Sequence, residues 1–332
     1  MKALVLAPFD SAALERLGQS MEVAYESWID TRKLLSPEEF VERIQREDIG
    51  ILVVEADFLP REVFEKADKL KMVGVCRADA SHIDMEAATE YGVPVVNTPA
   101  RNAIAVAELT VGLMLSLIRK IPDAHNMVRS RQWVDPTGAY FTLRGTELTG
   151  KTVGIVGFGA IGRLVARLLQ AFDTSIIVYD PFLPGEKVRE RGAEPVELDD
   201  LMSRSDIITL HCSVTPESMG LLDARRIALM KPTACLVNAA STFVIDNEAV
   251  IGALREKRIA GAAFDVYETW PVRPDSPLLE LDNVVLTPHI GGATAETLVR
   301  YSGWIVDDVE RFLRGERPVN LLNPQVWEKH GG

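Results

Sequence analysis

The chain has 332 residues, a length that suggests two domains at roughly 100–200 residues each. Its 36 Lys and Arg side chains stand against 48 Asp and Glu, and the net charge of −12 argues against nucleic acid or an anionic membrane as a partner. The hydrophobic content of 47% and the charged content of 25% are typical of a globular protein.

The N-terminal apolar run is short and meets Pro8 and Asp10, so no signal peptide is expected. No apolar run reaches the roughly 18 residues of a membrane span. The three cysteines, Cys76, Cys212 and Cys235, stand singly in or beside apolar runs, and we expect them to be reduced thiols. No group of Cys and His has the spacing of metal ligands. These features predict a cytoplasmic protein that binds no metal.

Short apolar runs alternate with amphipathic segments, the pattern of parallel, doubly wound sheets. In the first hundred residues the expected strands are Ala3–Ala7, Glu22–Glu26, Ile51–Val54, Met72–Cys76 and Val93–Val96. A helix over residues 102–119 is apolar almost all round, so we expect it to be buried between domains or subunits. The stretch 122–150 is less regular and carries several aromatic residues, which predicts an arm that packs on a partner subunit.

A second alternation begins at Lys151. Its expected strands are Thr152–Val156, Ser175–Tyr179, Ile207–His211, Ala234–Asn238, Ala260–Val266 and Val284–Thr287. The last expected helix covers residues 295–314 and stops before Gly315. The fold class is therefore predicted as α/β, with two doubly wound parallel-sheet domains.

A glycine-rich loop follows the first strand of this second half. The segment 152–162 reads TVGIVGFGAIG, with an apolar strand before the glycines and an amphipathic helix after them. Gly157 permits a tight turn, Gly159 allows the backbone to approach a pyrophosphate, and Gly162 allows close helix–strand packing. Asp180 ends the next strand, 18 residues after Gly162. A carboxylate there binds the ribose hydroxyls and repels a 2′-phosphate, so NAD is the predicted cofactor.

From Met72 onward the sequence resembles the D-isomer-specific 2-hydroxyacid dehydrogenases, the family that includes phosphoglycerate dehydrogenase. The matching stretches are 87–99, 102–108, the glycine-rich loop, 210–216, 230–232, 262–266 and 286–292. The resemblance implies a flavodoxin-like substrate domain formed by residues 1–100 and 294–332. It also implies a Rossmann NAD domain over residues 101–293 and a homodimer built through that domain.

The resemblance also implies a set of cofactor-binding residues in the glycine-rich loop and after later strands. They are Gly157, Phe158, Gly159, Ala160, Ile161, Gly162, Asp180, Cys212, Ser213, Ala239, Ala240, Asp265, Gly291 and Gly292.

The family uses a His as acid/base, a Glu that orients this imidazole, and an Arg that holds the substrate's carboxylate and carbonyl. His289 matches the family His. Ser241 stands where the Arg belongs, and Trp270 stands where the Glu belongs. These three positions form the predicted catalytic site, although two of its three catalytic groups are absent. Glu268, two residues before Trp270, is an alternative partner for the imidazole.

The segment that corresponds to the family's glycine-rich substrate loop is short and has no glycine. It begins Arg77-Ala78-Asp79, and Asp79 would repel a substrate carboxylate. Arg77 or Arg101 could replace the lost cation, and for each the alternative is a solvated side chain or a structural ion pair. The predicted substrate-binding residues are Arg77, Ala78, Asp79, Arg101 and Asn102.

Three functions are compatible with this pattern. The predicted one is an NAD-dependent oxidoreductase that acts on the CH–OH group of a small hydroxylated substrate through an altered active site. The second is a conventional 2-hydroxyacid dehydrogenase whose missing groups come from elsewhere in the chain. The third is an NAD-binding sensor or scaffold without efficient turnover. The sequence does not identify the substrate.

Overall fold

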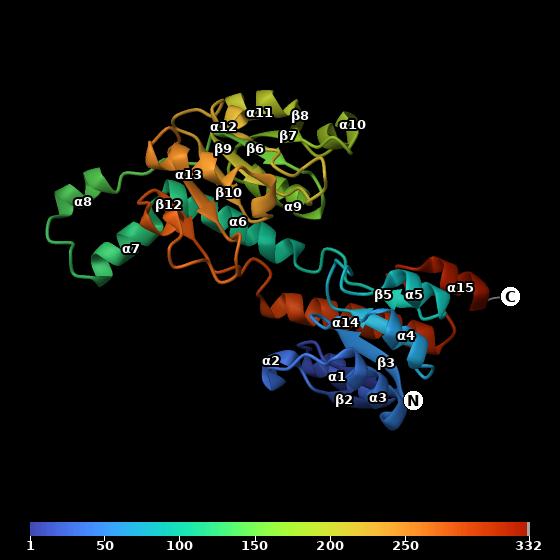
Figure 1. Cartoon of the computed structure of the whole chain (residues 1–332). Helices are drawn as coiled ribbons and strands as arrows, with labels where there is room; N and C mark the ends of the chain where they lie inside the picture. Colours follow the sequence, from blue (N-terminus) through green and yellow to red (C-terminus); the bar gives the residue numbers. More distant parts are fainter. Residues whose placement is uncertain (331–332) are drawn as a thin grey trace. The chain divides into compact units, whose positions relative to one another are not determined.

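The structure is a computed structural model, and it describes residues 1–330. The chain divides into two compact units (Figure 1). Unit 1 comprises Met1–Arg101 together with the C-terminal segment that starts at Thr294, and unit 2 comprises Asn102–Ala293.

Unit 1 contains a five-stranded parallel sheet in the order β2-β1-β3-β4-β5. Its strands are β1 (Lys2–Val5), β2 (Glu22–Tyr25), β3 (Ile49–Val54), β4 (Met72–Val75) and β5 (Val95–Val96). Its helices are α1 (Ser11–Gly18), α2 (Trp28–Thr31), α3 (Pro37–Glu47), α4 (Arg61–Lys66), α5 (Met85–Glu90), α14 (Ala295–Leu313) and α15 (Pro324–His330).

Both faces of this sheet are covered by apolar side chains. Alternate residues of the strands point to opposite faces, so Leu4 and Leu52 belong to one apolar cluster and Ala3 and Ile51 to the other. Helix α14 covers the second face together with α1. Unit 1 therefore needs the C-terminal segment to complete its core.

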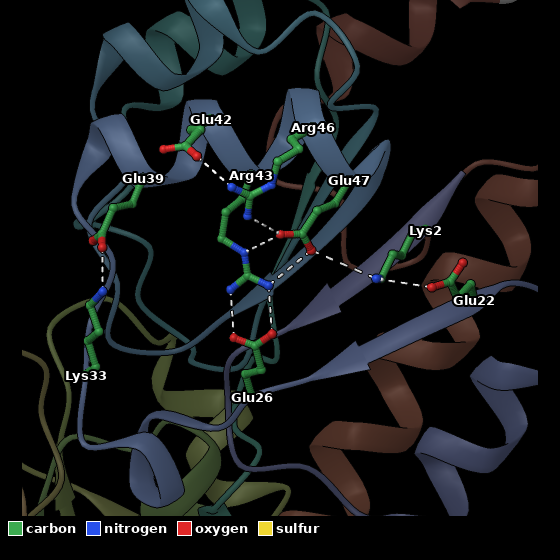
Figure 2. A network of polar contacts seen from close by, with 9 residues as sticks. All are labelled: Lys2, Glu22, Glu26, Lys33, Glu39, Glu42, Arg43, Arg46 and Glu47. Carbon is green, nitrogen blue, oxygen red and sulfur yellow. Dashed lines mark hydrogen bonds and ion pairs between the residues drawn. The ribbon is translucent and has the colours of Figure 1, made fainter.

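A network of charged side chains ties β1, β2 and α3 together in unit 1 (Figure 2). The guanidinium of Arg43 donates to both carboxylate oxygens of Glu26, at 2.7 Å each, and its Nε donates to Glu47 at 3.0 Å. Lys2 lies 3.9 Å from Glu47 and 3.1 Å from Glu22. The Arg43 side chain is only 16% exposed, so its ion pairs are better shielded from water than an ordinary surface pair.

Unit 2 contains a seven-stranded parallel sheet in the order β12-β11-β10-β9-β6-β7-β8. Its strands are β6 (Thr152–Val156), β7 (Ser175–Tyr179), β8 (Glu194–Pro195), β9 (Ile207–Leu210), β10 (Cys235–Asn238), β11 (Gly261–Phe264) and β12 (Val284–Leu286). Its helices are α6 (Ala103–Ile118), α7 (Ile121–Arg129), α8 (Pro136–Thr142), α9 (Ala160–Gln170), α10 (Gly185–Arg189), α11 (Leu198–Arg204), α12 (Ala224–Ile227), α13 (Asn247–Arg255) and the short 3-10 helices η1 (Thr242–Val244) and η2 (Pro277–Glu280).

The apolar helix α6 packs against α9 and against β10, β11 and β12 of its own unit. Much of the apolar surface of α6 is therefore buried in the core of unit 2. Helices α7 and α8, in green in Figure 1, project from the body of the unit. Exposed aromatic residues lie on α8, at Tyr140 (69% exposed) and Phe141 (67%), and between the two helices, at Trp133 (55%).

The two parallel sheets confirm the predicted α/β class. Four elements were missed. Helices α7 and α8 lie largely within the stretch 122–150, which the sequence analysis described only as less regular. Strand β8 is a two-residue edge strand that contains Pro195, and neither its length nor its composition gives a strand signal. A short helix, α15, follows the helix that the sequence predicts as the last one.

Candidate NAD-binding and catalytic site

The glycine-rich loop joins β6 to α9 with the geometry that a dinucleotide needs. Gly157 has a φ of +90°, and a Cβ there would lie 2.5 Å from the backbone nitrogen of Cys212. A Cβ on Gly162 would lie 2.2 Å from the carbonyl oxygen of Gly157. A Cβ on Gly159, by contrast, would meet nothing within 4 Å. The backbone is therefore closed on the protein side and open where a pyrophosphate would approach.

The start of α9 supplies hydrogen-bond donors at this opening. Gly159 is the N-cap residue, and no side chain accepts from the first turn, so the amides from Ala160 onward are available to an anion. Phe158 is buried, with 1% exposure, and packs beneath the loop, while Ile161 packs against the same apolar cluster.

Asp180 follows β7 and is fixed beside the glycine-rich loop. One carboxylate oxygen accepts from the backbone N–H of Phe158 at 2.7 Å, and the other accepts from the N–H of Phe182 at 2.9 Å. Each oxygen retains a lone pair, so the carboxylate can still accept from ribose hydroxyl groups. The position fits the predicted selection of NAD over NADP.

The other predicted cofactor-binding residues follow three further strands of the same parallel sheet. Cys212 and Ser213 follow β9, Ala239 and Ala240 follow β10, and Gly291 and Gly292 lie on the loop after β12. Because the carboxyl ends of parallel strands share one edge, these loops lie on the edge that carries Gly157 and Asp180. The side chain of Asn102, the N-cap residue of α6, lies beside Gly292, whose Cβ would be 2.9 Å from its Nδ2.

The structure gives Asp265 a use that the sequence did not indicate. Its carboxylate is buried and accepts from Thr287 Oγ1 at 2.6 Å, from the N–H of Ile290 at 2.9 Å and from the N–H of Gly291 at 2.7 Å. These contacts fix the loop on both sides of His289. Asp265 therefore positions the loop that carries the predicted acid/base.

His289 is held in the left-handed backbone region, with a φ of +56°. This conformation is unfavourable for a residue with a side chain, and such strain is found preferentially at functional sites. The imidazole lies beside the indole of Trp270, with ring centroids 5.7 Å apart and planes inclined by 58°. The aromatic ring thus occupies the neighbourhood in which the family places its Glu.

Glu268 does not take the place of the missing carboxylate. Its Oε1 accepts from Asn247 Nδ2 at 2.9 Å, so the alternative pairing of Glu268 with His289 is not found. Ser241 stabilises its own loop: its hydroxyl accepts from the N–H of Phe243 at 3.2 Å, and its carbonyl accepts from Asn238 Nδ2 at 2.9 Å. Neither group supplies the charge of the family Arg or Glu.

His211 is a second histidine at the end of β9, and the sequence analysis did not single it out. Its Nε2 lies 2.9 Å from Thr209 Oγ1, while its Nδ1 is buried without a partner among the described residues. Burial lowers the pKa of His211 to about 3, so its imidazole is neutral near pH 7. A half-buried ring that is neutral near pH 7 is a poorer candidate for the acid/base than His289.

In unit 1, the loop after β4 carries Arg77, Ala78 and Asp79. Asp79 is exposed and accepts from the hydroxyl and the N–H of Ser81, at 2.6 and 3.1 Å. The carbonyl of Ala78 accepts from Asn97 Nδ2 at 2.6 Å. The Arg77 side chain is exposed and forms no ion pair with any residue of the range 1–330. The loop thus brings together one solvated cation and one solvated carboxylate.

Arg101, by contrast, is engaged in an ion pair. Its Nη2 donates to Glu55 Oε1 at 2.7 Å, and its Cζ lies 4.6 Å from the ring centroid of Tyr301. This agrees with the structural ion pair that the sequence left open. The partners come from distant parts of unit 1, and no local sequence pattern relates them.

Within residues 1–330, no group of three or more His, Cys, Asp and Glu side chains is placed to hold a metal ion. No helix in this range has the length and apolar composition needed to cross a membrane.

The fold and the loop edge of unit 2 define a dinucleotide-binding protein of the Rossmann type. A model of the D-isomer specific 2-hydroxyacid dehydrogenase family, NAD binding domain, matches residues 111–291. The D-3-phosphoglycerate dehydrogenase of Methanocaldococcus jannaschii is 39% identical over 325 residues, which are 97% of this chain and 59% of that protein. The glyoxylate reductase of Thermofilum pendens is 39% identical over 299 residues, 88% of this chain and 86% of that protein.

Among solved structures, the apo form of D-lactate dehydrogenase from Escherichia coli superposes with a TM-score of 0.79 and 30% identity, over 97% of this chain and all of that one. The chain therefore belongs to the D-isomer specific 2-hydroxyacid dehydrogenase family, and its cofactor is NAD. It spans 59% of the length of the phosphoglycerate dehydrogenase that it matches.

Proposed function

We propose that the protein is an NAD-dependent dehydrogenase that interconverts the CH–OH and C=O forms of a small substrate, with His289 as its acid/base. The observation that carries this proposal is the place of His289 on the loop after β12, on the same sheet edge as the glycine-rich loop. The buried carboxylate of Asp265 accepts from the N–H groups of Ile290 and Gly291 and so fixes the loop next to His289.

Bound NAD supplies the hydride acceptor or donor for the substrate carbon. In the oxidative direction the imidazole of His289 takes the hydroxyl proton as the C–H bond breaks, and in the reductive direction it returns a proton to the carbonyl oxygen. Ser241 and Trp270, at the positions of the family Arg and Glu, are uncharged and supply neither a cation nor a carboxylate to this reaction. Arg77 and Arg101, with Ala78, Asp79 and Asn102, are the proposed substrate-binding residues, and the carboxylate anchor comes from one of the two arginines.

The proposed substrates are small hydroxy acids and their oxo forms, the class to which the substrates named for the relatives belong. We propose a homodimer formed through unit 2, because α8 and the segment that joins it to α7 present exposed aromatic side chains, Phe141 and Trp133. A cytoplasmic location is proposed because the described cysteines are all free thiols, as in a reducing compartment.

The experiment that tests this function follows the absorbance of NADH at about 340 nm. Oxidation of NADH is measured with glyoxylate, pyruvate and the uncharged glycolaldehyde, and formation of NADH is measured with D-lactate and a set of polyols. Turnover with any of these compounds supports the dehydrogenase. Tight NAD binding, measured by calorimetry, without turnover on the whole panel would favour the alternative of an NAD-binding sensor or scaffold.

A further inference from the structure

The cluster around Arg101 in unit 1 has the properties of a prepared anion-binding group. We propose that Arg101 replaces the missing family Arg as the residue that binds the substrate's carboxylate, and that Glu55 and Tyr301 hold it in position. This inference rests on the proposed function, and it assigns the carboxylate contact of that function to a single residue.

The guanidinium of Arg101 is fixed on two sides. Nη2 donates to Glu55 Oε1 at 2.7 Å, and the other carboxylate oxygen of Glu55 accepts from Trp28 Nε1 at 3.2 Å. The face of the guanidinium lies 4.6 Å from the centroid of the Tyr301 ring, a distance suited to a cation–π contact. Tyr301 is itself held, because its hydroxyl donates to the carbonyl of Pro8 at 2.7 Å. The plane of the guanidinium is therefore set before any ligand arrives.

This fixed group still has donors to offer. A guanidinium carries five N–H groups, and the contact with Glu55 uses one of them. The side chain is 19% exposed, so it is largely covered and not fully closed to solvent. Two parallel N–H groups of a guanidinium match the two oxygens of a carboxylate.

The position of the cluster in the fold also points to ligand binding. The sheet order β2-β1-β3-β4-β5 reverses direction between β1 and β3, and open α/β sheets bind ligands outside the carboxyl ends of the strands at such a point. Pro8 follows β1 and Glu55 follows β3, so the partners that fix Arg101 lie at this reversal. The chain of Arg101 is also held there, because its carbonyl accepts from Arg300 Nη1 at 2.6 Å.

Arg77 is the weaker candidate for the same role. Its side chain is exposed, and within the described residues it has no ion pair, so binding a carboxylate would cost the side-chain entropy that Arg101 has already lost. The structure thus distinguishes two arginines that the sequence left equivalent.

The test compares KM values of the full-length protein for glyoxylate, which carries a carboxylate, and for glycolaldehyde, which does not. Because hydrogen bonds to a charged group contribute strongly, Arg101→Met should raise KM for glyoxylate about 100-fold or more and leave KM for glycolaldehyde within about threefold. Arg101→Lys, which keeps the charge but loses the planar pair of donors, should give an intermediate rise. Arg61→Met, at an exposed arginine of unit 1 that lies in neither proposed site, is the matched control and should change both KM values by less than about threefold.

Oxalate, a dicarboxylate that cannot be reduced by hydride transfer, gives a second readout by calorimetry on the NADH-loaded protein. Its affinity should fall in Arg101→Met and stay unchanged in Arg61→Met, provided that circular dichroism shows both variants folded. Glu55→Gln should weaken oxalate binding less than Arg101→Met does, because the amide oxygen can still accept from the guanidinium.

The proposal is overturned if Arg101→Met binds oxalate and uses glyoxylate like the native protein, or if the loss appears in Arg77→Met instead. An equal loss with glyoxylate and glycolaldehyde would also overturn it, since a structural role affects both probes. If the native protein turns over no compound of the panel, the proposed function fails, and the oxalate titration still decides whether Arg101 binds carboxylates.

Discussion

The indole of Trp270 lies against the imidazole of His289, with their ring centroids 5.7 Å apart. Trp270 is 75% exposed, so its ring contributes little to the core of unit 2. An aromatic ring can contact an imidazole, but it cannot accept the strong, charge-assisted hydrogen bond that a carboxylate accepts from the ring N–H. The proposed acid/base therefore has an uncharged aromatic neighbour in Trp270.

We predict that restoring the family groups through Ser241→Arg with Trp270→Glu raises kcat/KM on simple 2-oxo acids such as glyoxylate at least tenfold. The added Arg supplies a bidentate carboxylate contact, and hydrogen bonds to charged groups contribute about 1.5–3 kcal/mol each. The added Glu stabilises the protonated imidazole, so the pH at which the reduction rate falls to half should move upward. Steady-state kinetics from pH 5 to pH 10 measure both effects.

Trp270→Phe is the control for this pair of changes, because it keeps an aromatic ring beside His289 and adds no charge. Its kcat should stay within about fivefold of the native value, and its pH profile should not move. The prediction is refuted if the double variant is folded and binds NADH but its kcat/KM on 2-oxo acids is no higher than that of the native protein. The absence of the family Arg and Glu would then not limit activity on these substrates.

The second prediction concerns His289. His289→Ala should abolish turnover, with kcat reduced by about 10²–10⁴ as expected for the loss of a general acid/base. NAD affinity should remain within a few-fold, because the glycine-rich loop and Asp180 are unchanged. The measurement pairs steady-state kinetics with a calorimetric titration of NAD.

His211→Gln serves as the comparison variant for that experiment, since His211 is half-buried and its lowered pKa keeps it neutral at the assay pH. It should retain kcat within about tenfold. If His289→Ala keeps full activity, the family mechanism does not apply to this chain.

Most of the sheet architecture was predictable because buried parallel strands read as short apolar runs bounded by helices. Strand β8 was not, since a two-residue edge strand containing Pro195 carries no such run. The glycine-rich loop was predictable from spacing, because its backbone geometry requires Gly at fixed positions.

The partners of the site residues were less accessible from the sequence. Glu268 is close to Trp270 in the chain, and only the structure shows that Asn247 holds it. Tertiary packing brings Arg101 into contact with Glu55 and Tyr301, and Glu55 into contact with Trp28. No spacing in the sequence relates these residues. A sequence pattern indicates which residue types are present, whereas the direction of a carboxylate depends on the three-dimensional packing around it.

The third prediction concerns cofactor choice. Asp180→Ser should weaken NAD binding about tenfold and bring NADP affinity to within a few-fold of it, because the carboxylate that accepts from the ribose and repels a 2′-phosphate is removed. The native protein should bind NAD much more tightly than NADP. Fluorescence titration with both cofactors checks this, and Asp123→Ser, on the exposed surface of α7, is the control that should change neither affinity. Equal affinities in the native protein would reject the role of Asp180.

The last prediction concerns the charged network of unit 1 and its dependence on pH (Figure 2). The hydrogen bond from Arg43 is the main cause that lowers the pKa of Glu47 to about 2, from its ordinary value of 4.5. A carboxyl group whose pKa is depressed by folding stabilises the folded state above its unfolded pKa, and this contribution is lost as the pH falls from 4.5 towards 2. Arg43→Met should therefore lower the free energy of unfolding by about 1–3 kcal/mol at pH 7. This is less than the loss of a fully buried ion pair would cause, because water partly screens the charges of Arg43 and its partners. The difference in unfolding free energy between the native protein and Arg43→Met should shrink steadily as the pH is lowered towards 2.5.

Urea unfolding at pH 7, 5 and 3 measures this difference. Arg46→Met is the control, since the 61% exposed Arg46 should contribute less than about 0.5 kcal/mol at any pH. A difference that stayed constant across this range would show that Arg43 stabilises the fold by packing and not by its ion pairs.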